Sequence, residues 1–104
     1  MNELTSIPTT FTLAAAVRNF ELVRSGTLHL FRIEIGQPIQ DVETVSGPDW
    51  RCPVRFIEDE TIKLHNICGI DSFQALHLAF NFVQRELESI VKDNDVELRF
   101  SGSS

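Results

Sequence analysis

Hydrophobic and polar residues alternate along several short stretches of the chain, and this period of two predicts β-strands. The first pair is a hairpin, with one strand over residues 20–23, a turn at Ser25 and Gly26, and a returning strand over residues 27–35. Apolar positions in the returning strand change parity once along its length. That change predicts a β-bulge near Leu30.

The clearest alternation covers residues 50–57 and 62–65, on either side of an acidic run at residues 58–60. With the three acidic residues as the loop, Phe56 lies opposite Ile62 in a second antiparallel hairpin. This register is self-consistent because it pairs apolar residues with apolar residues. The segment between the two hairpins is less regular.

A helix is predicted to begin after Asp71, a good N-cap residue with Gln74 at the capping-box spacing, and to end near Lys92. Apolar residues recur there at steps of three and four and form one stripe. The stripe consists of Phe73, Leu76, Phe80, Val83, Leu87 and Ile90. A last strand is predicted over residues 96–100.

These elements predict an α+β fold, with an antiparallel sheet of about five strands and one long helix packed on one face. The chain has 104 residues, 42% of them hydrophobic and 23% charged, which suits one folded domain. We expect an N-terminal arm over residues 1–17, the α+β domain over residues 18–100, and a flexible tail over residues 101–104.

The chain is acidic, with 15 Asp and Glu against 9 Lys and Arg and a formal net charge of −6. Nine of the acidic residues, but only four of the basic ones, lie beyond residue 57. Because nucleic-acid affinity depends on Lys and Arg, this balance disfavours a nucleic-acid partner and favours a basic protein. No apolar run is long enough to cross a membrane and no signal peptide is recognisable, so we expect a cytoplasmic protein without a membrane partner.

Candidate catalytic and metal-ligating residues are few. Cys52 shares the strand parity of the apolar residues around it, which predicts a small core residue. Cys68 stands before a turn, and His65 and Cys68 are spaced so that they point to opposite faces of a strand. The sequence therefore predicts no cofactor, no metal and no enzyme activity.

The candidate partner contacts are six acidic residues and two apolar ones. The acidic residues are Glu58, Asp59 and Glu60 at the second hairpin and Asp93, Asp95 and Glu97 after the helix. Leu78 and Phe82 lie off the main stripe and predict a second apolar patch, a possible anchor. We expect either the N-terminal arm, with Phe11 and Leu13, or another protein chain to cover this patch.

Two motifs carry a family resemblance. D-W-R-C-P at residues 49–53 and G-I-D-S-F-Q-A-L at residues 69–76 resemble a family of small bacterial proteins of unknown function, over about residues 18–100. In size, charge and missing catalytic motifs, the chain is also similar to immunity proteins of bacterial toxin systems, including contact-dependent growth inhibition. That similarity implies binding to a cognate, basic, nuclease-like toxin domain. The alternative is a homo-oligomeric accessory domain, for example a homodimer, without catalytic activity.

Overall fold

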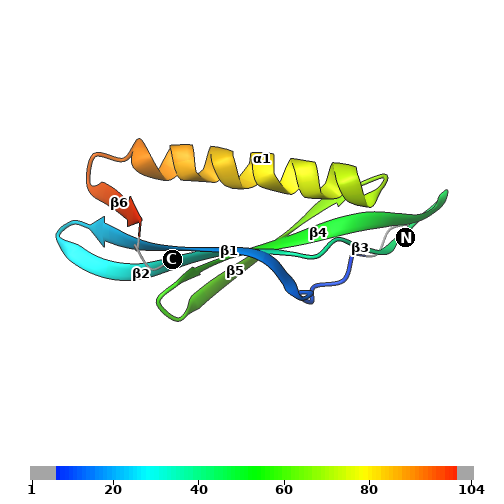
Figure 1. Ribbon diagram of the computed structural model, residues 1–104, viewed down its shortest axis with the longest axis horizontal. Helices are drawn as coiled ribbons and strands as arrows, with labels where there is room; N and C mark the ends of the chain where they lie inside the picture. The colour runs from blue at the N-terminus through cyan, green and yellow to red at the C-terminus, as the bar shows by residue number, and fades with distance from the viewer. Residues whose placement is uncertain (1–6, 101–104) are drawn as a thin grey trace.

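The computed structural model describes residues 7–100, so residues 1–6 of the expected arm and the expected tail at 101–104 lie outside the described residues. Over the described range the fold is α+β, as the sequence predicts, with one helix packed against an antiparallel sheet (Figure 1). The elements are β1 (Ala14–Arg24), β2 (Thr27–Gly36), β3 (Ile39–Thr44), β4 (Gly47–Glu58), β5 (Thr61–Gly69), α1 (Ser72–Val91) and β6 (Val96–Phe100).

The sheet is built around β4, which pairs with β5 along one side and with both β2 and β3 along the other. Beyond β2 come β1 and then β6. Ile35 of β2 pairs with Val54, and Ile39 of β3 pairs with Arg51, so β2 and β3 lie end to end along β4. The break between them falls beside Pro53, which has no N–H to donate to a ladder.

The first hairpin has its predicted turn, but its first strand is longer than predicted. Ser25 and Gly26 have φ angles of 52° and 82°, which suits a tight two-residue hairpin turn. The strand begins at Ala14, inside the segment assigned to the arm. The predicted bulge near Leu30 is wrong, because the register with β1 shifts only between Ala14 and Ala16. Leu30 instead lies on the sheet face away from the helix.

The register predicted for the second hairpin is wrong by one residue. Only Asp59 and Glu60 form the turn, so Phe56 lies opposite Lys63 rather than Ile62. Asp59 adopts a φ of 54°, a left-handed conformation that Asp tolerates better than most residues. Because a one-residue slip exchanges the two faces of a strand, Ile62 lies on the face away from the helix, where it is 57% exposed.

The helix begins as the capping pattern predicts. Asp71 Oδ1 accepts a hydrogen bond from the Gln74 backbone N–H at 2.7 Å, and Gln74 Oε1 accepts from the Ile70 N–H at 2.8 Å. The last residue of β5 lies tightly against the first turn, since a Cβ at Gly69 would stand 2.6 Å from the Ala75 nitrogen. The absence of a side chain at position 69 therefore lets the helix start close to the sheet.

The face that α1 packs against the sheet is rotated relative to the predicted stripe. Ala75 and Ala79 are fully buried, whereas Phe73 is 80% exposed and Phe80 is also exposed. The alanines allow close approach of the helix to the sheet, and Phe82 then packs beside them against the core. The other four stripe residues, Leu76, Val83, Leu87 and Ile90, do pack against the core.

The hydrophobic core lies between α1 and the sheet, and phenylalanine rings run across it. Phe31 stacks with Phe56 at a centroid distance of 6.2 Å, and Phe20 and Phe82 extend the row on either side. Cys52 is fully buried among these residues, as predicted. Burying each large apolar side chain stabilises the fold by about 1.5–3 kcal/mol.

On the opposite face, the segment before β1 lies across the sheet, away from the helix (Figure 1). Arg51, only 1% exposed, holds this segment by donating to the Thr10 carbonyl at 2.6 Å. The same guanidinium binds both carboxylate oxygens of Asp41 and the Asn66 Oδ1, while Asn66 Nδ2 donates to the Pro8 carbonyl at 2.9 Å.

The arm therefore does not cover the patch that the sequence suggested. The Phe11 ring lies 4.0 Å from the Arg55 guanidinium on the face away from the helix. Leu13 is exposed. The expectation that Phe11 and Leu13 fold over Leu78 and Phe82 is wrong.

Candidate functional site

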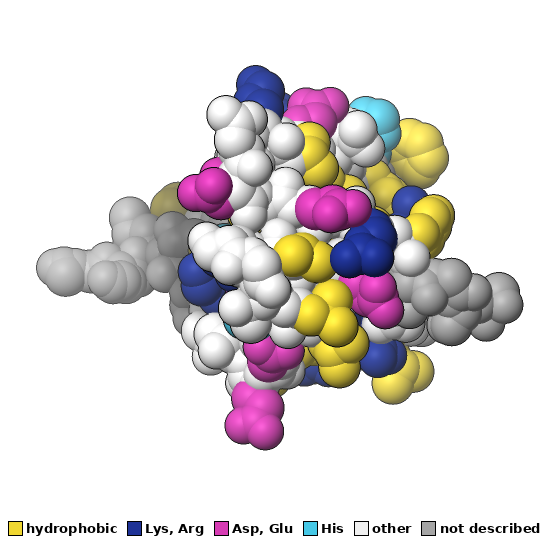
Figure 2. All heavy atoms as spheres, turned by 90° about the vertical axis from the view of Figure 1, so that its left-hand side faces the viewer, with side chains coloured by type: hydrophobic (Ala, Val, Ile, Leu, Met, Phe, Trp, Pro, Cys, Tyr) yellow, Lys and Arg dark blue, Asp and Glu magenta, His cyan; other side chains and the backbone are white. Residues whose placement is uncertain are grey.

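The two acidic groups predicted from the sequence lie at the same end of the molecule, the end where α1 terminates (Figure 1). The Asp59 N–H donates to the Leu30 carbonyl at 2.8 Å, which fixes the β4–β5 turn beside β2. The Ser25 N–H donates to the Asp95 carbonyl at 3.0 Å, which fixes the loop after α1 beside the β1–β2 turn. We call the six residues Glu58, Asp59, Glu60, Asp93, Asp95 and Glu97 the acidic end. Figure 2 views this end, where acidic side chains are spread from top to bottom with basic and hydrophobic ones between them.

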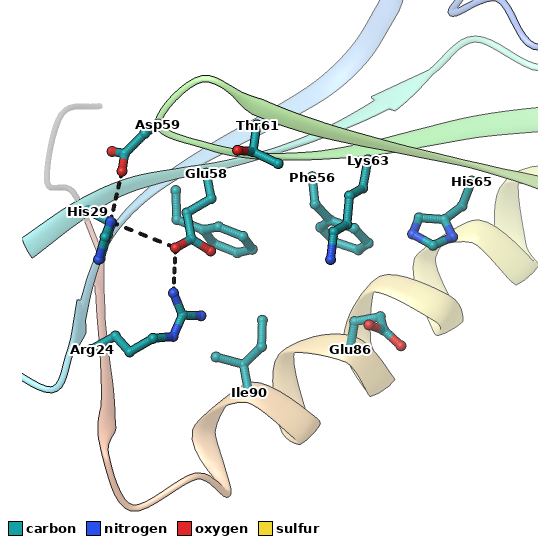
Figure 3. Close-up of a pocket in the computed structure, with 11 residues that line it drawn as sticks. Arg24, His29, Phe56, Glu58, Asp59, Thr61, Lys63, His65, Glu86 and Ile90 are labelled. Carbon is teal, nitrogen blue, oxygen red and sulfur yellow. Dashed lines mark hydrogen bonds and ion pairs between the residues drawn. The ribbon is translucent and has the colours of Figure 1, made fainter.

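Two of these carboxylates are held by neighbouring side chains (Figure 3). Glu58 forms an ion pair with Arg24, and Asp59 Oδ2 lies 2.7 Å from His29 Nδ1. Asp59 Oδ1 also accepts from the Leu30 N–H at 3.0 Å. The hydrogen bond with His29, followed by the one from Leu30, lowers the pKa of Asp59. The turn is thus held in one conformation with its carboxylate ionised.

The other four acidic residues are more exposed to a partner. Asp93 Oδ1 accepts from the Asp95 N–H at 3.0 Å and shapes the loop after the helix. Glu97 lies 3.4 Å from Arg99, with both side chains exposed. Within residues 7–100, the carboxylates of Glu60, Asp93 and Asp95 form no ion pair with Lys, Arg or His. These three carboxylates are therefore the ones available to a cation from outside.

A groove of about 610 Å³ opens beside the acidic end, between the C-terminal half of α1 and strands β2, β4 and β5. Its apolar lining is formed by Phe31, Phe56 and Ile90. Lys63 from β5 and Glu86 from α1 point into the groove from opposite sides (Figure 3). The groove is also lined by Arg24, His29, Glu58, Asp59, Thr61 and His65.

This groove could not be predicted from the sequence. Lys63 and His65 reach the helix side of the sheet only because the hairpin register is shifted by one residue from the predicted one. Glu86 then faces the sheet as a half-buried residue of α1. The helical position of Glu86, three residues after Val83 and four after Phe82, was the one signal that placed it on the packed face.

The two predicted apolar anchors differ in their surroundings. Phe82 packs against the Phe56 ring at 6.0 Å and the His65 ring at 5.0 Å, so it contributes to the layer between helix and sheet. Leu78, one helical turn earlier on α1, is exposed. Phe82 therefore offers a partner less apolar surface than the sequence suggested, and contact of either residue with a partner stays a prediction.

The cysteines lie on opposite faces of the sheet, away from the groove. Burial raises the pKa of the Cys52 thiol to about 11, and its Sγ donates to the Gly36 carbonyl at 3.2 Å. Burial, together with the charge of Asp49, also raises the pKa of Cys68. Among residues 7–100, no three His, Cys, Asp or Glu side chains are grouped as metal ligands. In the same part of the chain, no helix has both the length and the apolar character needed to span a bilayer.

Comparison with known proteins gives one match. The sequence model of a family described as a domain of unknown function (DUF6968) matches residues 16–104. This confirms the expectation of an uncharacterised family. No curated protein and no solved structure matches the chain.

Proposed function

The chain belongs to the DUF6968 family of domains of unknown function, and on that premise we propose that it binds a basic protein partner through its acidic end. The observation that supports this proposal is the convergence of six acidic residues from two separate parts of the sequence. They come from the β4–β5 turn and from the segment after α1, and backbone hydrogen bonds hold both beside the β1–β2 hairpin.

The electrostatics of such a surface favour fast and selective association. A fixed group of like charges attracts a partner of opposite charge and orients it before contact. Because Asp59 is already tied to His29 and Leu30, little conformational entropy is lost there on binding. The aromatic lining of the adjacent groove then offers a recess for an apolar or aromatic side chain of the partner.

The partner we propose is a toxin domain that acts on nucleic acid, since such a domain is itself basic. The protein would then be an immunity protein that neutralises its toxin in the cytoplasm. The acidic end supplies the charge complementarity that this role needs, and the bulk negative charge of the chain prevents competition from nucleic acid.

The test is co-expression with the C-terminal fragment of the protein encoded immediately upstream. The expected result is a fragment that arrests growth alone, growth restored by this protein, and a complex that co-purifies. A harmless fragment, or rescue without a complex, would contradict the proposal.

A matched pair of charge reversals tests the surface. Glu60→Lys changes an exposed residue of the acidic end, whereas Glu43→Lys changes an exposed residue of β3, outside the acidic end. Association measured at low salt should slow about tenfold or more with Glu60→Lys, lose part of its salt dependence, and stay unchanged with Glu43→Lys. Equal effects of the two variants would show that only net charge matters.

A further inference from the structure

The sheet face away from α1 is covered along only part of its length. The N-terminal segment crosses it near Arg51 and Asn66, and toward the β1–β2 turn no other segment among residues 7–100 covers it (Figure 1). Apolar side chains stand there in place of the polar ones expected on a solvated face. We call the residues Leu28, Leu30, Ile57, Ile62 and Leu64 the open face.

These residues lie on the same face of three neighbouring strands. Ile57 lies directly opposite Ile62, and on β2 the residue opposite Ile57 is Arg32, with Leu30 two positions before it on the same face. Leu28, Leu30 and Ile62 are 55%, 66% and 57% exposed, so each leaves more than half of its side chain in water. Contiguous exposed apolar residues of this kind mark interaction sites.

The open face has a hollow and a projection side by side. A shallow hollow of about 520 Å³ is lined by Leu30, Arg32 and Ile57, together with Asn19, Phe20, Phe31, Glu34 and Asp59. The exposed Ile62 stands next to it, across the strand pair from Ile57. A two-fold interface requires the same patch on both partners. A projection beside a hollow meets that requirement, because the projection of each copy can occupy the hollow of the other.

The charges beside the open face also favour a second copy over a basic partner. Glu34, which is nearly buried, accepts from Arg32 at 2.7 Å and from Arg55 at 2.6 Å, so its charge is neutralised internally. Asp59, which also lines the hollow, is hydrogen-bonded to His29. Because the acidic groups beside this face have cationic or hydrogen-bonding partners within the same chain, two copies can meet there with little repulsion.

We propose that two copies of this chain associate face to face through the open face, with Ile62 of each copy in the Leu30–Ile57 hollow of the other. The two proposals can be tested separately, because the two surfaces share only Asp59, and neither Ile62 nor Leu30 belongs to the acidic end.

The experiment is light scattering coupled to size exclusion, followed by sedimentation across a concentration series, with the full chain. The expected result is twice the monomer mass at high concentration. Ile62→Lys should raise the dissociation constant about tenfold or more, because it places a charge in the hollow of the other copy. The control is Val45→Lys, which changes a still more exposed apolar residue in the β3–β4 turn and should leave the dimer intact.

Leu30→Lys provides a second test from the hollow side, should Ile62→Lys fail to fold by circular dichroism. It should weaken the dimer to a similar extent. A chain that stays monomeric at every concentration overturns the proposal. So does a dimer that both lysine variants leave intact, because its interface would then lie on another surface.

Discussion

Arg51 donates to the backbone carbonyl of Thr10 at 2.6 Å, across 41 positions of sequence, while only 1% of its side chain is exposed. A buried guanidinium is tolerated when it is paired with a carboxylate and its donors are used, and Asp41 and Asn66 complete that set. The D-W-R-C-P motif therefore has a structural task, which is to hold the N-terminal segment against the sheet.

Replacing Arg51 with Met should lower the free energy of unfolding by about 3 kcal/mol, because the substitution leaves Asp41 without its partner. The released segment should also become a site of rapid proteolysis. Urea unfolding and limited proteolysis measure the two effects. Arg85→Met, on the exposed side of α1, is the control and should change stability by less than about 0.5 kcal/mol. Equal effects at the two positions would contradict the role assigned to Arg51.

Gly69→Ala should be more destabilising than Gly36→Ala. A Cβ at position 69 meets the Ala75 backbone, which cannot move without displacing α1, so we expect a loss of about 2 kcal/mol. A Cβ at position 36 meets side-chain atoms, those of Thr12, Pro53 and Phe11, and the Thr12 hydroxyl, which lies nearest, can move more easily than backbone. Urea midpoints of the two variants provide the comparison. A smaller loss at position 69 would show that the helix start is adjustable.

Asp59→Asn should reduce stability at neutral pH and have no effect in acid. Because the pKa of Asp59 is lower in the folded state than in the unfolded one, its carboxylate stabilises the fold above the unfolded value of about 4. That contribution is lost as the pH falls through the folded-state pKa. Asn tolerates the left-handed backbone of the turn, so the backbone should not change. Urea unfolding from pH 7 to pH 3 tests this, and a pH-independent difference would contradict it.

The two thiols should differ in reactivity in the native protein. Cys68 is exposed and should react with a disulfide reagent, whereas Cys52, whose thiol has a pKa of about 11, should react only after unfolding. The Cys68→Ser variant isolates the Cys52 signal. Stopped-flow absorbance with and without urea measures both rates. Fast labelling of Cys52 in the native variant would mean that the core between helix and sheet opens readily.

The fold class and the start of the helix could be predicted from the sequence because they depend on local signals. Asp71 and Gln74 specify the cap through neighbouring backbone groups, and Ser25 with Gly26 specifies a tight turn. The buried face of α1 was harder to predict, because the pattern of apolar residues gives more weight to Phe73 than to Ala75. The helix lies close to the sheet at Gly69, which favours the smaller residue on the buried face. The spacing of apolar residues in the sequence does not indicate the distance between helix and sheet.

The candidate site was only half predictable for a related reason. The acidic residues after β4 and after α1 could be recognised in the sequence, and backbone hydrogen bonds hold both groups at the same end of the molecule. The groove depends on the register of the β4–β5 hairpin. That register was predicted wrongly, because Phe56 was paired with Ile62 on the ground that both are apolar. Apolar matching fails there because the sheet carries apolar residues on both faces. Ile62 lies on the face without a helix. Alternation within a single strand shows which residues share a face, but not which of the two faces packs against the helix.

The pairing of β1 with β6 has a consequence for how the chain acquires its structure during synthesis. Phe20 pairs with Phe100, so this edge of β1 keeps unpaired backbone groups until residues 96–100 have left the ribosome. Contacts separated by so much sequence form late, and an open strand edge is prone to pair with another chain in the meantime. The short strand β6 thus covers the Phe20–Arg24 part of this edge, and we expect the nascent protein to be more vulnerable to aggregation before β6 has emerged.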